Sequence, residues 1–251
     1  MVKRDFVSGS AMKTYPKALL EKSIDVGTET EPQIPRRASV GDDVYEVLLT
    51  RLISLKIAPG ARINVDGLVK DLGVSQTPIR AALVRLEAEG LVVKTHLVGY
   101  SAAPLPSRRR FEQIFELRVL LEPVVAAKAA RALTPQDRTA LGELHAAMAA
   151  PSSDDARLAY GKFATWDAAF HARIATASGS ELIAETLARL HTHMHLFRLL
   201  FHSRVTEEAI REHADVITAL NAGDPDAAYA SMERHIVFSQ RRMAPIFEIL
   251  D

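Results

Sequence analysis

The sequence predicts a mainly α-helical protein with two folded domains: a small head of three helices and a β-hairpin, then a larger antiparallel all-helical bundle. Three observations predict this fold class. Apolar residues recur at helical spacing from Val40 onward. Between Leu91 and Ala102 the pattern changes to that of two short strands. Helical spacing then returns and continues to the end of the 251-residue chain.

Length and composition are those of a globular protein. A chain of 251 residues is longer than one ordinary domain and long enough for two. Its 48% hydrophobic and 25% charged residues exclude disorder of the whole chain. Because no apolar run is long enough to span a bilayer, we expect a cytoplasmic protein without a membrane partner. The chain has no cysteine, so any transition metal must be bound by His, Asp or Glu.

Charge is divided unevenly along the chain, although the formal net charge is zero. Residues 36–110 contain 12 Lys and Arg against 7 Asp and Glu, a net charge of +5. Residues 111–251 contain 14 against 19, a net charge of −5. Since a basic segment favours a polyanionic partner, this division gives some support to nucleic-acid binding by the head.

Capping and turn residues set the expected elements of the N-terminal part. Residues 1–37 have no sustained period and are expected to form a flexible arm. The head is expected at residues 38–104. Gly73 is expected to close its second helix in a left-handed C-cap, and Ser75 to cap the third. The three helices are expected at Ser39 to Leu55, Leu68 to Leu72 and Ser75 to Gly90.

The second domain is expected at residues 105–251 and is helical throughout. Thr134-Pro135 and Asp224-Pro225 each place a capping side chain before a proline at the first helical position. No fixed repeat appears, so the sequence predicts a bundle and not a solenoid. Its helices are expected at Ser107 to Ala132, Thr134 to Ala149, Asp155 to Ser178, Glu181 to Phe201, Glu207 to Ala222 and Pro225 to Leu250.

The head contains two adjoining runs whose order and spacing agree with a known signature: GVSQTPIRAAL at residues 73–83 and RLEAEGLV at residues 85–92. They resemble the signature of the GntR family of bacterial transcription regulators, and the resemblance covers about residues 39–103. It implies a winged helix-turn-helix that binds double-stranded DNA. Because one short recognition helix reads few bases, we expect a homodimer on a palindromic operator.

The third helix is the expected recognition helix. Gln76, Thr77 and Arg80 lie on its exposed N-terminal turn, and the apolar residues of the same helix face inward. The resemblance implies that Arg80 is the main base or phosphate contact. Many relatives carry arginine at the position of Gln76, so we expect a shifted operator sequence. The other contacts implied are Ser75 and Thr77 to phosphates, Gly99 at the wing tip near the minor groove and, as a weaker candidate, Arg85.

All nine histidines lie at or after His96, and eight of them fall in the second domain. Asp167 and His171 are four residues apart within one predicted helix, so their side chains share a face. His213 and His235 lie on two later helices. Because a bundle can bring side chains from three antiparallel helices to a common centre, these four residues are the candidate metal site.

This set resembles the metal-binding subset of the FCD domain, the helical ligand-binding domain of FadR-type GntR regulators. The resemblance covers about residues 111–246 and implies that Asp167, His171, His213 and His235 bind a divalent metal, with zinc expected first and nickel, manganese or iron left open. A competing pair, His191 and His195, has His193 and His202 nearby. We rank it lower because no carboxylate accompanies it at metal spacing.

Two arginines are candidate effector contacts. Arg118 resembles the family arginine that contacts the carboxylate of the effector. A planar guanidinium suits that contact well. An alternative, equally favoured, is an ion pair with Glu122 one helical turn away. Arg198 is a second and weaker candidate.

Three functions are compatible with these features. The first is a homodimeric repressor, not an enzyme, whose operator binding is controlled by a small organic acid at the metal site. The second is a metal-dependent hydrolase or related enzyme that uses the centre of three histidines and one aspartate, although no placed general acid or base accompanies it. The third is a metal sensor in which the metal itself is the signal.

Overall fold

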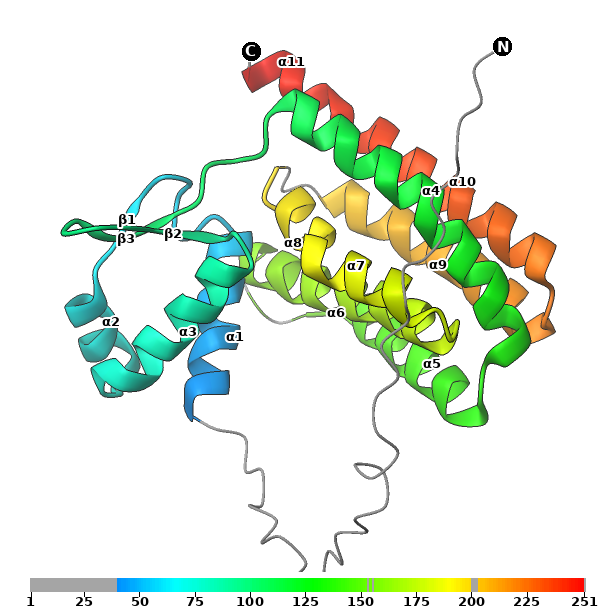
Figure 1. Ribbon diagram of the computed structural model, residues 1–251, viewed down its shortest axis with the longest axis horizontal. Coiled ribbons are helices and arrows are strands. Elements are labelled where there is room, and N and C mark those ends of the chain that lie inside the picture. The colour runs from blue at the N-terminus through cyan, green and yellow to red at the C-terminus, as the bar shows by residue number, and fades with distance from the viewer. Residues whose placement is uncertain (1–39, 153, 155, 200–202, 251) are drawn as a thin grey trace, which may run out of the picture. The chain divides into compact units, whose positions relative to one another are not determined.

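The computed structural model describes residues 40–152, 154, 156–199 and 203–250, and the predicted arm at residues 1–37 lies outside them. Helices make up most of this part of the chain, together with one three-stranded sheet (Figure 1). The predicted mainly α-helical fold class is confirmed. A search of the described helices found none with the length and apolarity needed to span a membrane.

Residues 40–102, here called the head, contain three helices and the sheet. The strands are antiparallel in the order β1-β3-β2, with Val92 opposite Ala102 and Ile63 opposite Tyr100. The strand β1 was not predicted, because two residues are too few to show a period of two. The elements are α1 (Val40–Ile53), β1 (Arg62–Ile63), α2 (Val65–Leu72), α3 (Gln76–Ala88), β2 (Val92–Thr95) and β3 (Gly99–Ala102).

Local signals explain the ends of the head helices. Asn64 caps α2 by accepting a hydrogen bond from the backbone N–H of Asp66. Gly73 takes the predicted left-handed conformation, with φ of 66°, at the C-cap of α2. Ser75 occupies the N-cap position of α3, as predicted, but its side chain makes no capping hydrogen bond. The helices pack around buried apolar side chains, among them Leu48, Leu52, Ile79, Leu83, Leu86 and Leu91.

Residues 108–250, here called the bundle, contain the remaining described helices. In the bundle α4 packs against α10, α6 and α9, and α5 packs against α6 and α9. Thr134 and Asp137 form a capping box at the start of α5, and Asp224 caps α10. The elements are α4 (Arg108–Ala132), α5 (Pro135–Ala149), α6 (Ala156–Ala177), α7 (Glu181–Leu190), α8 (Thr192–Phe197), α9 (Ser203–Ala222), α10 (Pro225–Met243), a 3-10 turn (Ala244–Ile246) and α11 (Phe247–Leu250).

Two predicted helices are interrupted in the structure. The helix predicted at 181–201 is divided into α7 and α8 by His191, whose φ is +44°. Apolar residues continue at helical spacing across this break, so the pattern could not reveal it. The helix predicted at 225–250 ends at Met243 and continues as a 3-10 turn, because Pro245 has no N–H to donate to the preceding turn of the helix.

Head and bundle belong to one compact unit, Ala38–Asp251, and the predicted division at residues 104 and 105 stays a prediction. The helix α1 packs against α6 and α8. At Gly161 of α6 a Cβ would lie 2.9 Å from Cγ2 of Thr50, so only glycine allows α1 this close. The guanidinium of Arg198, which follows α8, donates a hydrogen bond to the carbonyl oxygen of Ala103.

Candidate functional site

The N-terminal turn of α3 presents polar side chains on the surface of the head. Ser75, Gln76, Thr77 and Arg80 are all exposed, whereas Ile79 of the same helix is fully buried. The predicted division of this helix into a polar and an apolar face is therefore confirmed.

A chain of hydrogen bonds orders these side chains. The Gln76 amide donates to the Asp66 carboxylate at 2.7 Å, and its carbonyl oxygen accepts from Arg80 Nε and Nη2 at 3.3 and 3.1 Å. Since Asp66 is on α2, the two helices of the motif are joined at their exposed edge. Gln76 thus holds the Arg80 guanidinium along the outer face of α3.

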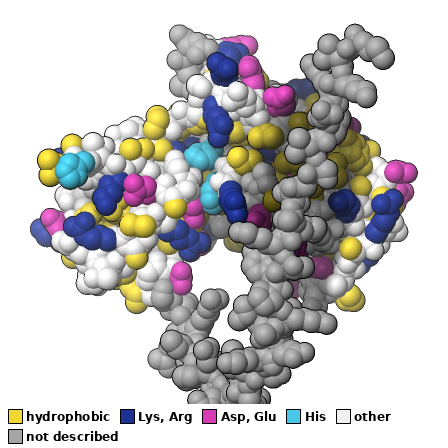
Figure 2. Space-filling model, in the orientation of Figure 1, with side chains coloured by type: hydrophobic (Ala, Val, Ile, Leu, Met, Phe, Trp, Pro, Cys, Tyr) yellow, Lys and Arg dark blue, Asp and Glu magenta, His cyan; other side chains and the backbone are white. Residues whose placement is uncertain are grey.

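The wing and Arg85 occupy different places. Gly99 begins β3 with φ of 106°, directly after the exposed turn residues His96, Leu97 and Val98. Lys and Arg side chains are visible over the head in Figure 2. Arg85 instead lies 3.6 Å above the ring of Tyr45 and pairs with Glu89 at 3.3 Å. The structure therefore does not bring Arg85 together with Gln76, Thr77 and Arg80.

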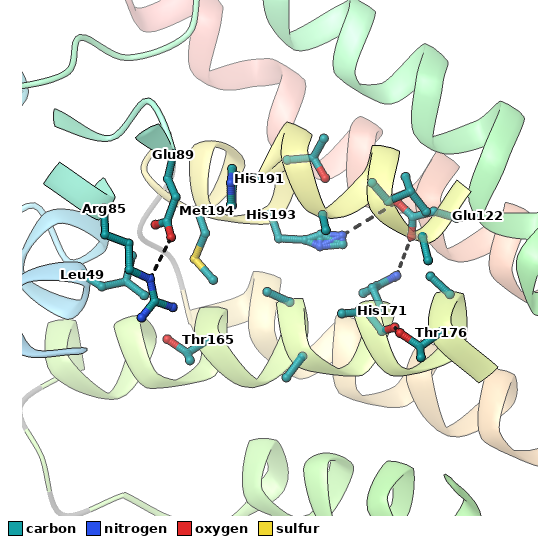
Figure 3. Close-up of a pocket in the computed structure, with 18 of the residues that line it drawn as sticks. Leu49, Arg85, Glu89, Glu122, Thr165, His171, Thr176, His191, His193 and Met194 are labelled. Carbon is teal, nitrogen blue, oxygen red and sulfur yellow. Dashed lines mark hydrogen bonds and ion pairs between the residues drawn. The ribbon is translucent and has the colours of Figure 1, made fainter. Parts of the chain in front are cut away.

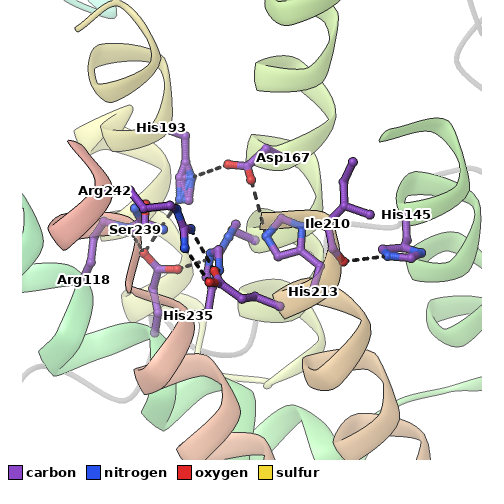
Figure 4. A network of polar contacts seen from close by, with 12 residues as sticks. Arg118, His145, Asp167, His193, Ile210, His213, His235, Ser239 and Arg242 are labelled. Atoms are coloured by element: carbon purple, nitrogen blue, oxygen red, sulfur yellow. Dashed lines mark hydrogen bonds and ion pairs between the residues drawn. The ribbon is translucent and has the colours of Figure 1, made fainter. Parts of the chain in front are cut away.

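Inside the bundle the four predicted metal ligands converge, and Figure 4 shows three of them, Asp167, His213 and His235. Asp167 and His171 come from α6, His213 from α9 and His235 from α10, and all four are buried. The three imidazoles each offer a nitrogen within 4.8 Å of the others. Nε2 of His213 lies 3.4 Å from Oδ1 of Asp167. We call these four residues the histidine cluster.

Carboxylates outside the cluster orient two of its rings. Oε2 of Glu122 lies 2.5 Å from Nδ1 of His171, and Oε2 of Glu212 lies 2.8 Å from Nδ1 of His235. Arg242 in turn donates two hydrogen bonds to Glu212, at 2.5 and 2.8 Å. A carboxylate on Nδ1 fixes the ring and leaves Nε2 available, which is the arrangement found around metal-bound histidines.

Burial shifts the titration of the cluster. It lowers the pKa of His213 well below its usual value and that of His235 to about 4, although the hydrogen bond to Glu212 acts to raise the pKa of His235. Burial also raises the pKa of Asp167 to about 6, against the attraction of nearby cationic groups. The imidazoles of His213 and His235 are therefore neutral at pH 7, which is the form that binds a metal.

The chemistry of these donors fits a divalent metal. Nε2 of His171 and Nδ1 of His213 are buried with neither a hydrogen bond nor an ion pair to any residue that the structure describes. Unpaired buried polar atoms are costly, and an ion among them would remove this cost. Three imidazoles and one carboxylate suit zinc and its neighbours among the transition metals.

Two residues next to the histidine cluster, His193 and Glu122, were not predicted as site residues. His193 on α8 lies 3.8 Å from Asp167 through Nδ1 and 3.8 Å from Glu122 through Nε2. In the sequence, His193 belongs to the competing histidine group, and Glu122 is predicted only as a partner of Arg118. The i,i+4 spacing of Arg118 and Glu122 was the available signal for Glu122, but no pattern placed His193. In the structure His193 alone of its group approaches the cluster, among the residues described; His202 lies outside them.

The two arginine candidates are both buried. Nε of Arg118 donates to Glu122 at 2.6 Å, so the ion pair considered from the sequence is present. Burial acts to raise the pKa of Glu122, but the positive charge of Arg118, together with His171, holds this pKa well below its usual range. Arg198 is fully buried at the boundary with the head, and its Nε and Nη1 have no partner within the described residues. It is not brought to the histidine cluster.

Comparison with known proteins matches both parts of the chain. Residues 41–100 match bacterial regulatory proteins of the gntR family, and residues 113–238 match the FCD domain. An HTH-type transcriptional regulator in an unstable DNA locus of Streptomyces ambofaciens is 27% identical over 77% of this chain and 80% of its own. The HTH-type transcriptional repressor RspR of Escherichia coli K12 is 24% identical over 82% of this chain and 90% of its own.

A solved structure agrees with the fold. E. coli McbR/YncC superposes with a TM-score of 0.64 over 86% of this chain and 100% of that one, at 23% identity. The matched family and these relatives are transcription regulators, so the prediction of a regulator and not an enzyme is confirmed, and the metal-dependent enzyme is not supported. The chain belongs to the GntR family of bacterial regulatory proteins, with a DNA-binding helix-turn-helix followed by an FCD domain.

Proposed function

We propose that this protein is a cytoplasmic homodimeric repressor whose operator binding responds to a small carboxylate at a metal held by Asp167, His171, His213 and His235. The observation that carries the proposal is the convergence of these four buried side chains, with Nε2 of His171 and Nδ1 of His213 left unpaired among the described residues. A bound ion would satisfy them.

The proposed metal is divalent, with zinc favoured. Such an ion supplies a positive charge and open coordination positions that attract a carboxylate. Glu122 and Glu212 would hold the rings of His171 and His235 in the binding orientation. Arg118 lines the narrow space beside Asp167 and His235, which supports its role in effector binding. Arg198 remains a weaker candidate because its charge lies at the boundary with the head.

The proposed DNA contacts are those of the exposed end of α3 and of the wing. Arg80 and Gln76 read base edges or phosphates, and Ser75 and Thr77 contact phosphates. Gly99 at the wing tip approaches the minor groove, and Arg85 is a secondary candidate for a backbone contact. A two-fold dimer on a palindromic operator supplies the second half-site. Repression is supported by the relative RspR, a transcriptional repressor whose match covers 82% of this chain.

The test measures how the metal and the acid together change the affinity for operator DNA. The operator is first selected from random duplexes with zinc-loaded protein, and a screen of organic acids by thermal shift identifies a stabilising ligand. Operator affinity is then measured by anisotropy with and without that acid, before and after removal of zinc. We expect the acid to weaken operator binding about 5- to 150-fold, and only in the presence of zinc.

Three outcomes contradict parts of the proposal. An operator without two-fold symmetry, or a monomer in light scattering at the concentrations of the titration, would refute the dimer. An acid effect that persists without zinc would refute the metal as part of the effector site. Operator binding that follows zinc alone, with no response to any acid, would favour the metal-sensor alternative.

A further inference from the structure

A cavity of about 360 Å³ lies between the head and the bundle (Figure 3). Its lining residues come from α1 and α3 of the head and from α4, α6, α7 and α8 of the bundle. This volume is within the range of small-molecule sites. Neither the matched families nor the metal site described above assigns an occupant to it.

The two ends of the cavity are polar. At the bundle end Glu122 faces His171 and His193, at 2.5 and 3.8 Å. At the head end Arg85 pairs with Glu89 at 3.3 Å (Figure 3). The wall between the ends is mostly apolar and includes Leu49, Ala168, Ala172, Ala175, Leu187 and Met194.

The ends differ in charge once the proposed metal is bound. At the bundle end the ion and Arg118 outweigh Asp167 and Glu122 by one positive charge, so an anion is attracted. At the head end Glu46 and Glu89 outnumber Arg85, so a second anion is repelled. A ligand that matches this gradient carries one negative charge and an apolar body.

The space on the other side of the histidine cluster cannot hold such a body. The pocket lined by Arg118, Asp167 and His235 has a volume of only about 10 Å³. That is about the minimum for one water molecule. His193 borders both this small pocket and the large cavity. An acid that reaches the cluster must therefore keep its hydrocarbon part in the large cavity.

We propose that this cavity is the effector site and that it takes a small monocarboxylic acid with an apolar body. The carboxylate lies toward His171 and His193, and the body extends toward Leu49 of the head. This inference rests on the proposed function, because the positive charge at the bundle end comes from the metal.

The same site explains how an effector acts on the head. The helix α8 carries His193 in the cavity wall. Two residues near His193 contact the head: His195 of α8 and Arg198, which follows α8. The ring of His195 lies 3.5 Å from where a Cβ of Gly90 would be, and it hydrogen bonds to the backbone of Glu89. Arg198 donates to the carbonyl oxygen of Ala103. A ligand that displaces His193 therefore moves an element on which the head rests.

The first test compares two acids of equal length on the zinc-loaded protein. Hexanoate carries one carboxylate and adipate carries two. We expect hexanoate to bind at least about 10-fold more tightly in calorimetric titrations, because the second carboxylate of adipate would approach Glu46 and Glu89. Equal affinity, tighter binding of adipate, or no binding of either acid to zinc-loaded protein would overturn the proposal.

A second test fills the cavity. Ala168 is half-buried in the cavity wall, so Ala168→Phe should abolish hexanoate binding while zinc content and thermal unfolding stay near those of the unchanged protein. Ala146→Phe on the exposed face of α5 is the matched control and should bind hexanoate normally. Normal hexanoate binding by Ala168→Phe would show that the acid sits elsewhere.

A third test changes the charge of the head and keeps the proposal falsifiable if Ala168→Phe does not fold. Glu46→Lys should reduce the preference for hexanoate over adipate at least about 3-fold, since the repelling charge becomes an attracting one. Glu87→Lys, the same change on a head residue outside the cavity, should leave the preference unchanged. An equal shift in both variants would refute a direct contact.

These outcomes separate the two proposals. Loss of zinc from the unchanged protein would refute the metal site and with it the proposed function. Retention of zinc together with an unaltered acid preference in Glu46→Lys would refute only the cavity as the effector site.

Discussion

The exposed end of α3 and the histidine cluster represent two ways of building a binding site. Gln76, Thr77 and Arg80 lie within five residues of one helix and are supported by short-range contacts such as the bond from Gln76 to Asp66. The cluster takes its residues from α6, α9 and α10, and it exists only when the whole bundle is packed. The first site therefore depends on a local motif, and the second on tertiary structure.

The largest expected effect tests the cluster. His213→Ala should abolish stoichiometric zinc binding, because His213 is fully buried and its Nε2 is one of the proposed ligand atoms, 3.4 Å from Oδ1 of Asp167. Elemental analysis of protein purified without chelator measures the loss. His96→Ala, at the exposed wing, should retain zinc. One full equivalent of zinc in His213→Ala would show that the cluster is not the metal site.

The next effect is the acid sensitivity of the metal-free bundle. The pKa of His213 and of His193 is held well below 6.5 by burial, so the unfolded chain binds more protons than the folded one below pH 6.5. Stability is then lost as the pH falls, at up to about 1.4 kcal/mol per pH unit for each histidine. His235, with a pKa of about 4, acts in the same direction.

Asp167 acts in the opposite direction. Its pKa of about 6 lies above the usual 3.8, so between these values the folded state holds the proton and gains stability as the pH falls. This offsets His235 and leaves His213 and His193 to determine the sign. Urea denaturation with chelator present should give a lower free energy of unfolding at pH 5 than at pH 7. A higher free energy at pH 5 would show that these histidines are protonated in the folded protein, and His193→Gln should reduce the difference.

The two sites also differ in how far the sequence could predict them. The α2–α3 turn followed from Gly73 and the run to Gly90, because each helix end there is set by residues within a few positions. Shared helix faces made the four residues of the cluster a candidate site, and the family resemblance implied that they are metal ligands. His193 was missed because its approach to Asp167 depends on the break at His191, where a single left-handed residue redirects the chain without changing the apolar spacing.

A smaller effect tests the exposed site. Arg80→Ala should weaken operator binding by about 1–3 kcal/mol and relax the sequence preference at one position of each half-site. Anisotropy titrations at fixed salt with single-base operator variants measure both quantities. Arg131→Ala, an exposed arginine near the end of α4, should bind as the unchanged protein does. Unaltered affinity and preference in Arg80→Ala would remove this residue from the reading face.

The smallest effect concerns the turn that presents α3. Gly73 has φ of 66°, and a side chain there costs about 1–2 kcal/mol because its Cβ crowds the backbone in the left-handed conformation. Gly142 in the middle of α5 has ordinary helical geometry and open space around it, so Gly142→Ala should raise the free energy of unfolding by about 0.5–1 kcal/mol. Gly73→Ala should lower it. Urea denaturation measures both changes in the free energy of unfolding. Opposite signs would show that the head depends on this one backbone conformation. Equal signs would mean that the turn relaxes around alanine and that core contacts set the orientation of α3.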